Sequence, residues 1–225
     1  MELLRRYSPV KFKGTRARTR VRNGWEVVLE YEKEGSGPFL IDLSHIGKWD
    51  VQGEDLPSLR PAGLGIPEDP RQCLLTGDFL LNLIKWNWAT IWHFSEEMPD
   101  FAEEYAFTNV TEAYALLALA GKEIFSVLEK LTSLDLLSPD RKPPFLTMGP
   151  VAHIRSQIVV LSRERDESVV LVACPRGYGQ SMAEIMLEAG KEYALRPGGE
   201  DGFSRLRRRY FISRVPDERI SPQDA

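Results

Sequence analysis

Cysteine and histidine are scarce in this chain of 225 residues, which holds two cysteines and three histidines. Cys73 and Cys174 lie far apart, and neither belongs to a CxxC pair, so neither a disulfide framework nor a thiolate zinc site is indicated. The histidines are scattered and lack the HExxH spacing of a metalloprotease. We therefore expect two buried free thiols and no structural zinc.

Long hydrophobic runs are absent as well. No segment approaches the roughly 20 apolar residues that a membrane-spanning helix needs. The first residues, Met1 to Arg6, are not followed by an apolar stretch of signal-peptide length. These absences predict a cytoplasmic chain with no membrane partner.

A strong net charge of either sign is missing too. The formal net charge is −4, and 43% hydrophobic and 28% charged residues are ordinary values for a globular protein. This balance argues against a general nucleic-acid binder. The length predicts one largish domain or two small ones, with room for a hydrophobic core.

Positive charge is nevertheless concentrated at the start of the chain. Residues 1–22 hold eight lysines and arginines. Two interpretations stay open: an arm that docks on an acidic partner, and a solvated leader. Nucleic-acid binding through 5–22 and the second basic cluster at 205–209 rests on these clusters alone, so we rank it last and expect no nucleic-acid partner.

The most informative segment present is Phe39 to Gly53. An apolar strand pattern, Phe39 to Leu43, runs into a polar group made of Asp42, Ser44 and His45, and alternation resumes after Gly47. In the second strand, Trp49 and Val51 share one face, while Lys48, Asp50 and Gln52 share the other. We interpret the segment as two strands joined by a compact corner that presents amides and side chains to a ligand.

An unusually aromatic segment follows at 79–94. Two strand patterns, 79–86 and 89–94, carry Trp86, Trp88, Trp92 and Phe94. Such side chains can stack on a flat heterocycle. Ordinary core packing or an exposed docking face explains the same composition at least as well.

Strand patterns outnumber helix patterns along the chain. A strand–strand–helix succession occurs twice, over about 105–131 and 154–190, and the second helix is expected to start near Ser181, in a capping box with Glu184, and to end at Gly190. We predict an α+β fold of antiparallel sheets with packed helices and two similar halves. The expected organisation is a basic arm at 1–22, one domain at 23–213 and a tail at 214–225.

Four segments resemble, in the same order, the aminomethyltransferases of the glycine cleavage system and the folate-binding proteins related to them. These segments are 41–53 (IDLSHIGK, then VQG), 108–121 (TNVTEAYALLALAG), 158–173 and 187–197 (LEAGKEYALRP). The resemblance covers most of 39–207 and implies the folate-binding domain of that family. The enzymes continue into a C-terminal barrel near the point where this chain ends, so we expect no such barrel.

The resemblance also implies candidate site residues, because tetrahydrofolate lies in the central hole of that domain in the enzymes. It places Asp78 as the catalytic carboxylate at the reacting end of the cofactor. It places Glu167 and Arg207 as cofactor contacts, together with Ser44 and His45 of the polar corner. Phe203 and Trp86 are the side chains that could plug the hole.

Several groups of the family site are replaced in this sequence. Residues 75–82 hold one aspartate instead of a pair, the hairpin tip at 164–168 has lost its glycines, and Phe203 and Ser204 stand where the enzymes have an arginine and an aspartate. Each unmet polar group of a buried pterin costs about 1–3 kcal/mol. The lost arginine removes a charge-assisted contact, and activation of the folate needs a carboxylate within reach.

These replacements favour an accessory role. The leading prediction is an accessory subunit of a folate, one-carbon or amine-oxidising complex with a degraded folate site, similar to the gamma subunit of heterotetrameric sarcosine oxidase. It implies a protein partner in a hetero-oligomer or homo-oligomer. The alternative is an active tetrahydrofolate-dependent aminomethyltransferase or one-carbon transferase that uses Asp78, Glu167 and Arg207.

Overall fold

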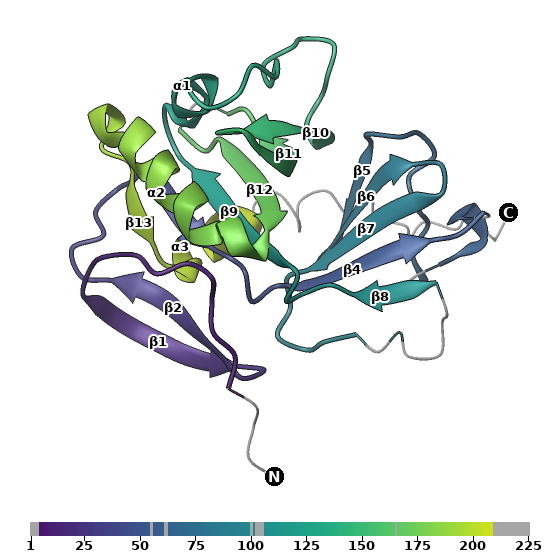
Figure 1. The fold of residues 1–225 in the computed structure, drawn as a ribbon, viewed down its shortest axis with the longest axis horizontal. Coiled ribbons are helices and arrows are strands. Elements are labelled where there is room, and N and C mark those ends of the chain that lie inside the picture. The colour runs from purple at the N-terminus through teal and green to yellow at the C-terminus, as the bar shows by residue number, and fades with distance from the viewer. Residues whose placement is uncertain are drawn as a thin grey trace, which may run out of the picture.

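The computed structural model describes residues 5–54, 56–60, 63–99, 101, 106–164 and 166–208, and their strands gather into three sheets (Figure 1). The tail expected at 214–225 lies outside the described residues, as does the end of the domain expected at 213. The architecture is mostly β with few helices, and the predicted antiparallel sheets with packed helices are confirmed.

The larger sheet has six strands in the order β10-β11-β12-β9-β3-β13, antiparallel throughout except between β3 and β13. Its strands are β3 (Phe39–Asp42), β9 (Tyr114–Ala120), β10 (Phe145–Val151), β11 (Ile154–Ser162), β12 (Val169–Pro175) and β13 (Arg196–Gly198). Leu117 and Leu119 of β9 pack with the helices, while Leu116 and Ala118 face the second sheet. This central strand is apolar at nearly every position because both of its faces are covered.

Two helices, α1 (Ile124–Glu129) and α2 (Gly179–Ala189), cover one face of this sheet (Figure 1). The helix α2 begins at Gly179 without a side-chain cap, so the predicted capping box at Ser181 is wrong. Gly190 is its C-cap, which confirms the predicted end. Other helical elements among the described residues are α3 (Glu200–Arg207) and the single turns η1 (Leu56–Ser58), η3 (Arg176–Tyr178) and η4 (Lys191–Tyr193).

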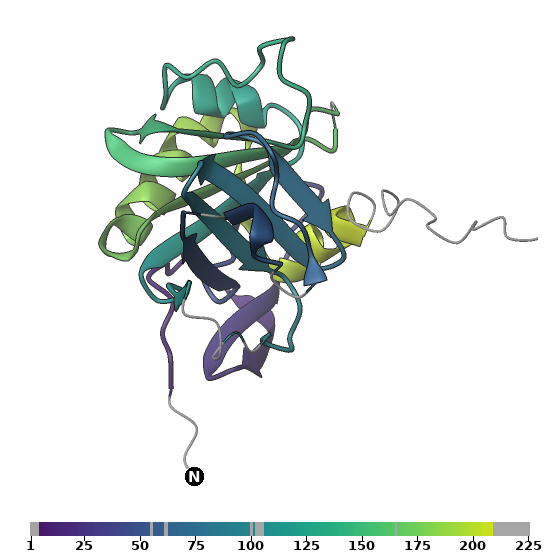
Figure 2. The ribbon, with the colours of Figure 1, turned by 90° about the vertical axis from the view of Figure 1, so that its right-hand side faces the viewer.

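The second sheet has five antiparallel strands in the order β5-β6-β7-β4-β8 and packs on the other face of the first (Figure 2). Its strands are β4 (Gly47–Gln52), β5 (Cys73–Thr76), β6 (Phe79–Lys85), β7 (Trp88–His93) and β8 (Phe107–Asn109). Leu56 and Phe101, from the long connections, cover its outer face. The two sheets therefore form a sandwich with a second apolar core between them.

The third sheet is a hairpin of β1 (Arg16–Arg22) and β2 (Trp25–Tyr31), which lies below the five-stranded sheet in Figure 2. Residues 16–22 of the predicted basic arm are thus a paired strand and not a free arm. Val10, earlier in the same stretch, is buried in the main core. The arginines of β1 alternate along this strand, which pairs with β2. The basic arm at 1–22 as a docking segment stays a prediction, as do the other domain bounds.

The predicted internal repeat is only half present. β11 and β12 form the expected hairpin ahead of α2. In the first unit, β8 pairs with β4 in one sheet, while β9 pairs with β3 and β12 in the other. The prediction of two similar halves is therefore wrong where it depends on this repeat, because the two strands diverge at Thr111 into different sheets.

Candidate functional site

A cavity of about 350 Å³ lies between the two large sheets. β4 and β7 form one wall, and β11 with parts of β9, β10 and β12 forms the other. Its polar lining residues are Lys48, Asp50, Thr90, Tyr114, Arg155, Ser156 and Gln157. A cavity of this size and mixed polarity is typical of small-molecule sites.

Aromatic side chains form much of the apolar lining. Trp88 and Trp92 of β7 line the cavity, whereas Trp86 is 66% exposed at the turn before that strand. Phe94 packs in the core against Phe203, with ring centroids 5.5 Å apart. Neither Trp86 nor Phe203 is among the lining residues, so neither plugs the cavity.

The polar wall on β4 follows from the alternation of that strand. Trp49 and Val51 are buried in the outer core of the five-stranded sheet. Lys48 and Asp50 therefore point to the opposite face, toward the cavity. The tertiary structure turns this polar face of the strand inward, between the two sheets.

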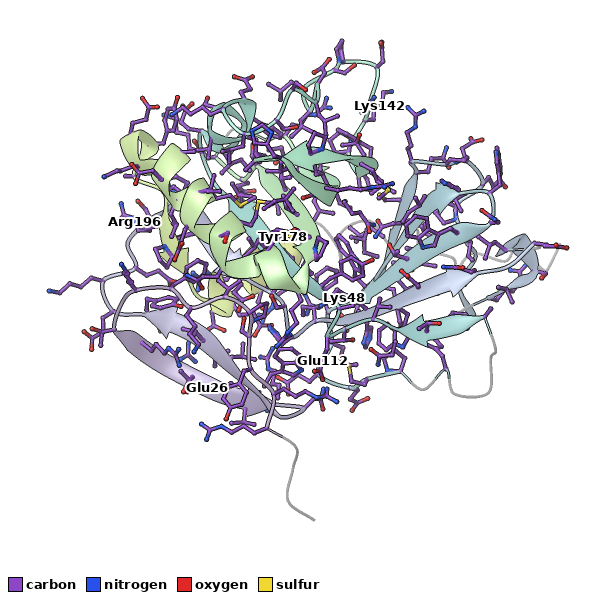
Figure 3. The ribbon with its side chains drawn as sticks, viewed as in Figure 1. Glu26, Lys48, Glu112, Lys142, Tyr178 and Arg196 are labelled. Carbon is purple, nitrogen blue, oxygen red and sulfur yellow. The ribbon has the colours of Figure 1, made fainter. Side chains whose placement is uncertain are left out.

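Lys48 is only 1% exposed although it carries an amine. Its Nζ donates to the carbonyl oxygens of Ser44, at 2.8 Å, and Ile46, at 2.7 Å. Burial lowers the pKa of Lys48 to about 7, because the nearby Asp42 carboxylate offsets the loss of solvent only in part and Arg176 adds to it. Figure 3 shows Lys48 where β4 approaches the six-stranded sheet.

Asp50 and Tyr114 share an electrostatic environment across the cavity. Burial raises the pKa of Asp50, and the Trp88 indole lowers it by a smaller amount. Burial also raises the pKa of Tyr114, with Asp50 acting in the same direction and Arg155 against it. Among the described residues, neither Asp50 nor Arg155 has an ion-pair partner within 4.0 Å. The cavity thus holds charges that the protein does not neutralise.

Hydrogen bonds to one threonine connect the two walls of the cavity. Gln157 Nε2 on β11 donates to Thr90 Oγ1 on β7 at 2.8 Å, and Asn82 Nδ2 on β6 donates to the same oxygen at 3.3 Å. Asn82 is fully buried. These bonds fix the separation of the sheets on one side of the cavity.

Ser44, a predicted cofactor contact, serves the corner between β3 and β4. Its Oγ donates to Asp42 Oδ1 at 2.6 Å and accepts from the backbone N–H of Leu116 at 3.2 Å. The side chain is fully buried, and Ser8 Oγ donates to the other oxygen of Asp42. These bonds tie the corner to β9 and to the segment that precedes β1.

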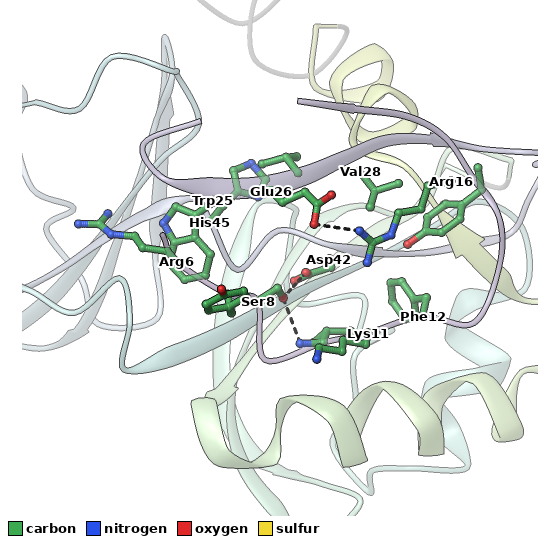
Figure 4. A pocket seen from close by; sticks show the side chains of 15 residues that line it. Arg6, Ser8, Lys11, Phe12, Arg16, Trp25, Glu26, Val28, Asp42 and His45 are labelled. Carbon is green, nitrogen blue, oxygen red and sulfur yellow. Dashed lines mark hydrogen bonds and ion pairs between the residues drawn. The ribbon is translucent and has the colours of Figure 1, made fainter. Parts of the chain in front are cut away.

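His45, the neighbouring predicted contact, faces a different space of about 70 Å³ under the β1–β2 hairpin (Figure 4). His45 Nε2 lies 3.4 Å from Glu200 Oε1, and Arg22 Nη1 donates to both oxygens of Glu200 at 2.6 Å. Burial disfavours the Glu200 carboxylate, but His45 and Arg22 outweigh this effect and hold its pKa below the ordinary value. This space is too small for a folate.

Asp78 and Arg207 lie together, as an ion pair at the turn between β5 and β6. Arg207 Nη1 is 2.8 Å from Asp78 Oδ1 and 2.9 Å from the carbonyl oxygen of Phe94. The Asp78 side chain is 45% exposed beside an open pocket that includes His93. Burial lowers the pKa of His93, Asp78 opposes this effect and Arg207 reinforces it.

Glu167 lies at the tip of the β11–β12 hairpin, where its backbone N–H donates to the carbonyl oxygen of Glu164 at 2.9 Å. The residues implied by the family resemblance therefore occupy three places, and none of them lines the cavity between the sheets. As arranged here they do not fit a folate held in that cavity, and we derive no reaction step through one. Their roles stay predictions.

Sequence reasoning named Trp88 and Trp92 as possible stacking residues, and both line the cavity, but it did not assign the polar lining residues. Lys48 and Asp50 could have been found, because the alternation of β4 already separates them from Trp49 and Val51. No local signal identifies Tyr114, Arg155 or Gln157, which come from β9 and β11 and meet β4 only through the packing of the two sheets.

Other kinds of site are not seen in the part of the chain that the structure describes. It contains no group of three or more histidine, cysteine, aspartate or glutamate side chains able to hold a metal ion. No helix among these residues has the length and apolarity to cross a membrane. Cys73 and Cys174 are both free thiols, as expected, with Cys174 buried and Cys73 partly buried.

No family model matches the chain, but comparisons with curated proteins and with solved structures both find similar chains. Over 102 residues, or 44% of the chain, it is 30% identical to sarcosine oxidase subunit alpha of Rhizobium meliloti (strain 1021), and it spans about 10% of the length of that protein. A chain of heterotetrameric sarcosine oxidase from Corynebacterium sp. U-96, solved in complex with pyrrole 2-carboxylate, superposes with a TM-score of 0.58 at 12% identity. That match covers 69% of this chain and 84% of the solved one, and it shows a shared fold.

Proposed function

We propose that this chain is an accessory subunit of a hetero-oligomeric, amine-oxidising complex in the cytoplasm, similar to the gamma subunit of heterotetrameric sarcosine oxidase. Its fold would then be that of the aminomethyltransferase folate-binding domain. Two comparisons support the proposal: the sequence match to a sarcosine oxidase subunit and the fold shared with a chain of a heterotetrameric sarcosine oxidase. The solved chain is also of similar size, since 69% of this chain accounts for 84% of it.

The pairing of Asp78 with Arg207 is the observation that carries the accessory role. A carboxylate that activates a folate must reach the reacting nitrogen. Asp78 instead lies outside the cavity, where its Oδ1 accepts a charge-assisted hydrogen bond from Arg207 at 2.8 Å. Asp78, the predicted catalytic carboxylate, therefore pairs with Arg207 outside the cavity. This arrangement supports a subunit that does not catalyse a reaction by itself.

Affinity purification of the tagged chain from its native cells tests this proposal. We expect larger oxidase chains to co-purify in a fixed ratio, with a single high-mass species in size-exclusion chromatography with light scattering. The same preparation should oxidise a secondary amine, while the isolated chain does not. A chain recovered alone as a monomer at native expression level would contradict the proposal.

A second candidate function is binding of a reduced folate in the cavity. Asp50, flanked by Trp88 and Trp92, favours it, because a carboxyl between aromatic walls suits a pterin edge. Calorimetric titration with 5-formyltetrahydrofolate tests it, with Asp50→Asn as the variant and Asp78→Asn as the matched control on the same sheet. Binding that Asp50→Asn weakens about tenfold and Asp78→Asn leaves unchanged would support this candidate. Absence of binding at millimolar ligand would exclude it.

A further inference from the structure

Lys48 is a buried amine that the proposed function does not use. Its Nζ donates to two backbone carbonyl oxygens, of Ser44 and Ile46, at 2.8 and 2.7 Å. A neutral amine has two N–H donors and one lone pair, whereas an ammonium has three donors. These two acceptors are enough for both N–H groups of a neutral amine and leave its lone pair unused.

Burial favours the neutral amine more strongly than the surrounding charges favour the ammonium. No carboxylate of the described residues lies within ion-pair distance of Nζ; the Asp42 carboxylate raises the pKa of Lys48 and outweighs Arg176, which lowers it, but both effects are smaller than that of burial. At a pKa of about 7, half of the molecules carry the free amine at neutral pH. For an ordinary lysine this fraction is smaller by on the order of a thousandfold.

Lys48 also lines the cavity of about 350 Å³, which is large enough to admit a small organic molecule. A lysine that only tied the corner at 44–48 could perform that task as an ammonium on the protein surface. This one is 1% exposed and lies in a wall shared with Asp50. Desolvated lysines with free lone pairs are the nucleophiles that form Schiff bases with carbonyl compounds.

We propose that Lys48 captures a short-chain aldehyde in the cavity as an imine. The amine nitrogen adds to the carbonyl carbon, and its proton moves to the carbonyl oxygen to give a carbinolamine. A proton from the solvent then adds to the hydroxyl, while Asp50, the one carboxyl group among the described lining residues, is a negative charge in the same wall. Water leaves as the C–O bond breaks, which yields a protonated imine. The step needs no oxidant or reductant.

The class of reaction that would supply this aldehyde is oxidation of an amine, because hydrolysis of the imine so formed releases one. Only the source of the aldehyde, oxidation of an amine, rests on the proposed function. Capture by Lys48 is a property of the isolated chain and is tested on it. A failure of capture would therefore leave the proposed assembly intact, and a failure of assembly would leave capture intact.

Reductive trapping tests the proposal on the purified full chain. Formaldehyde and cyanoborohydride convert each imine into a stable N-methyl group, which peptide mapping by mass spectrometry locates. At neutral pH we expect Lys48 to be methylated at least tenfold faster than the exposed Lys122, which serves as the internal control. Methylation of Lys48 no faster than that of Lys122 would overturn the proposal.

Two further measurements separate capture from a purely structural role. Methylation of Lys48 should level off above about pH 7 while that of Lys122 keeps rising with pH, a profile that needs no variant. Lys48→Met should lose the fast methylation, and Lys122→Met should keep it. If both lysines show the same pH profile, Lys48 is not the nucleophile we propose, even if Lys48→Met fails to fold.

Discussion

The β1–β2 hairpin and the cavity use charged side chains in opposite ways. On the hairpin, each arginine of β1 meets a carboxylate, as in Arg16 with Glu26 at 3.0 Å and Arg20 with Glu96 at 2.7 Å. In the cavity, Lys48 and Asp50 have no ion-pair partner among the described residues, and burial shifts the pKa of both. Paired charges fix the position of an element, whereas desolvated, unpaired charges are available to a ligand.

The largest effect is expected where a paired charge is also buried. Glu200 is 4% exposed and holds Arg22 and His45, so Glu200→Ala leaves two buried groups without their partner. We expect a loss of about 3 kcal/mol in the free energy of unfolding, measured by chemical denaturation. The control Glu30→Ala, on the same hairpin, removes an exposed pair with Arg18 and should cost less than about 1 kcal/mol. Equal losses for the two variants would contradict this view of the hairpin.

For the unpaired charges of the cavity, the test is how the stability of the protein depends on pH through the titration of Lys48. The unfolded chain keeps this amine protonated up to its ordinary pKa of 10.5, and the folded chain only up to about 7. Between these values the unfolded state binds more protons, so stability should rise with pH, by at most about 1.4 kcal/mol per unit.

Denaturation midpoints at about pH 7 and pH 9, for wild type and Lys48→Met, measure this contribution. The variant lacks the titrating group and should lose the rise. The same slope in both proteins would show that Lys48 is not desolvated in the folded state.

A smaller effect of the opposite sign is expected for Asp50. Its pKa is raised on folding, so its stabilising contribution is present at acid pH and is lost as pH rises through the folded value. At neutral pH the ionised carboxylate is therefore unfavourable, and Asp50→Asn should stabilise the protein by at most about 1 kcal/mol. Thermal unfolding at neutral and acid pH measures the gain, which should vanish below about pH 4.

The smallest effect concerns the partly buried pair of Asp78 and Arg207. Arg207 lowers the pKa of His93 and Asp78 raises it, so Arg207→Met should raise that pKa and Asp78→Asn should lower it. Titration of the imidazole by NMR measures both shifts. Arg205→Met, on the exposed face of the same helix, is the matched control and should leave the titration unchanged.

The positions of the strands along the chain could be predicted better than which strands pair with each other. Phe39–Asp42 and Gly47–Gln52 followed from alternation and from the polar corner between them. The first half of the predicted repeat failed, because local pattern cannot say that β8 and β9 pair into different sheets. The pairing of the basic stretch could not be predicted for the same reason, since Arg20 and Arg22 pair with Glu96 and Glu200, which lie far away in the sequence.

The sequence by itself determined which residues of β4 share a face, because side chains alternate along any strand. Only the tertiary structure decided that this polar face lies between two sheets, with Tyr114 and Arg155 opposite Asp50. It also decided the chemistry of Lys48, since the pKa of an amine depends on the water and charges around it. Those surroundings come from segments far apart in the chain, which only the packing of the sheets brings together.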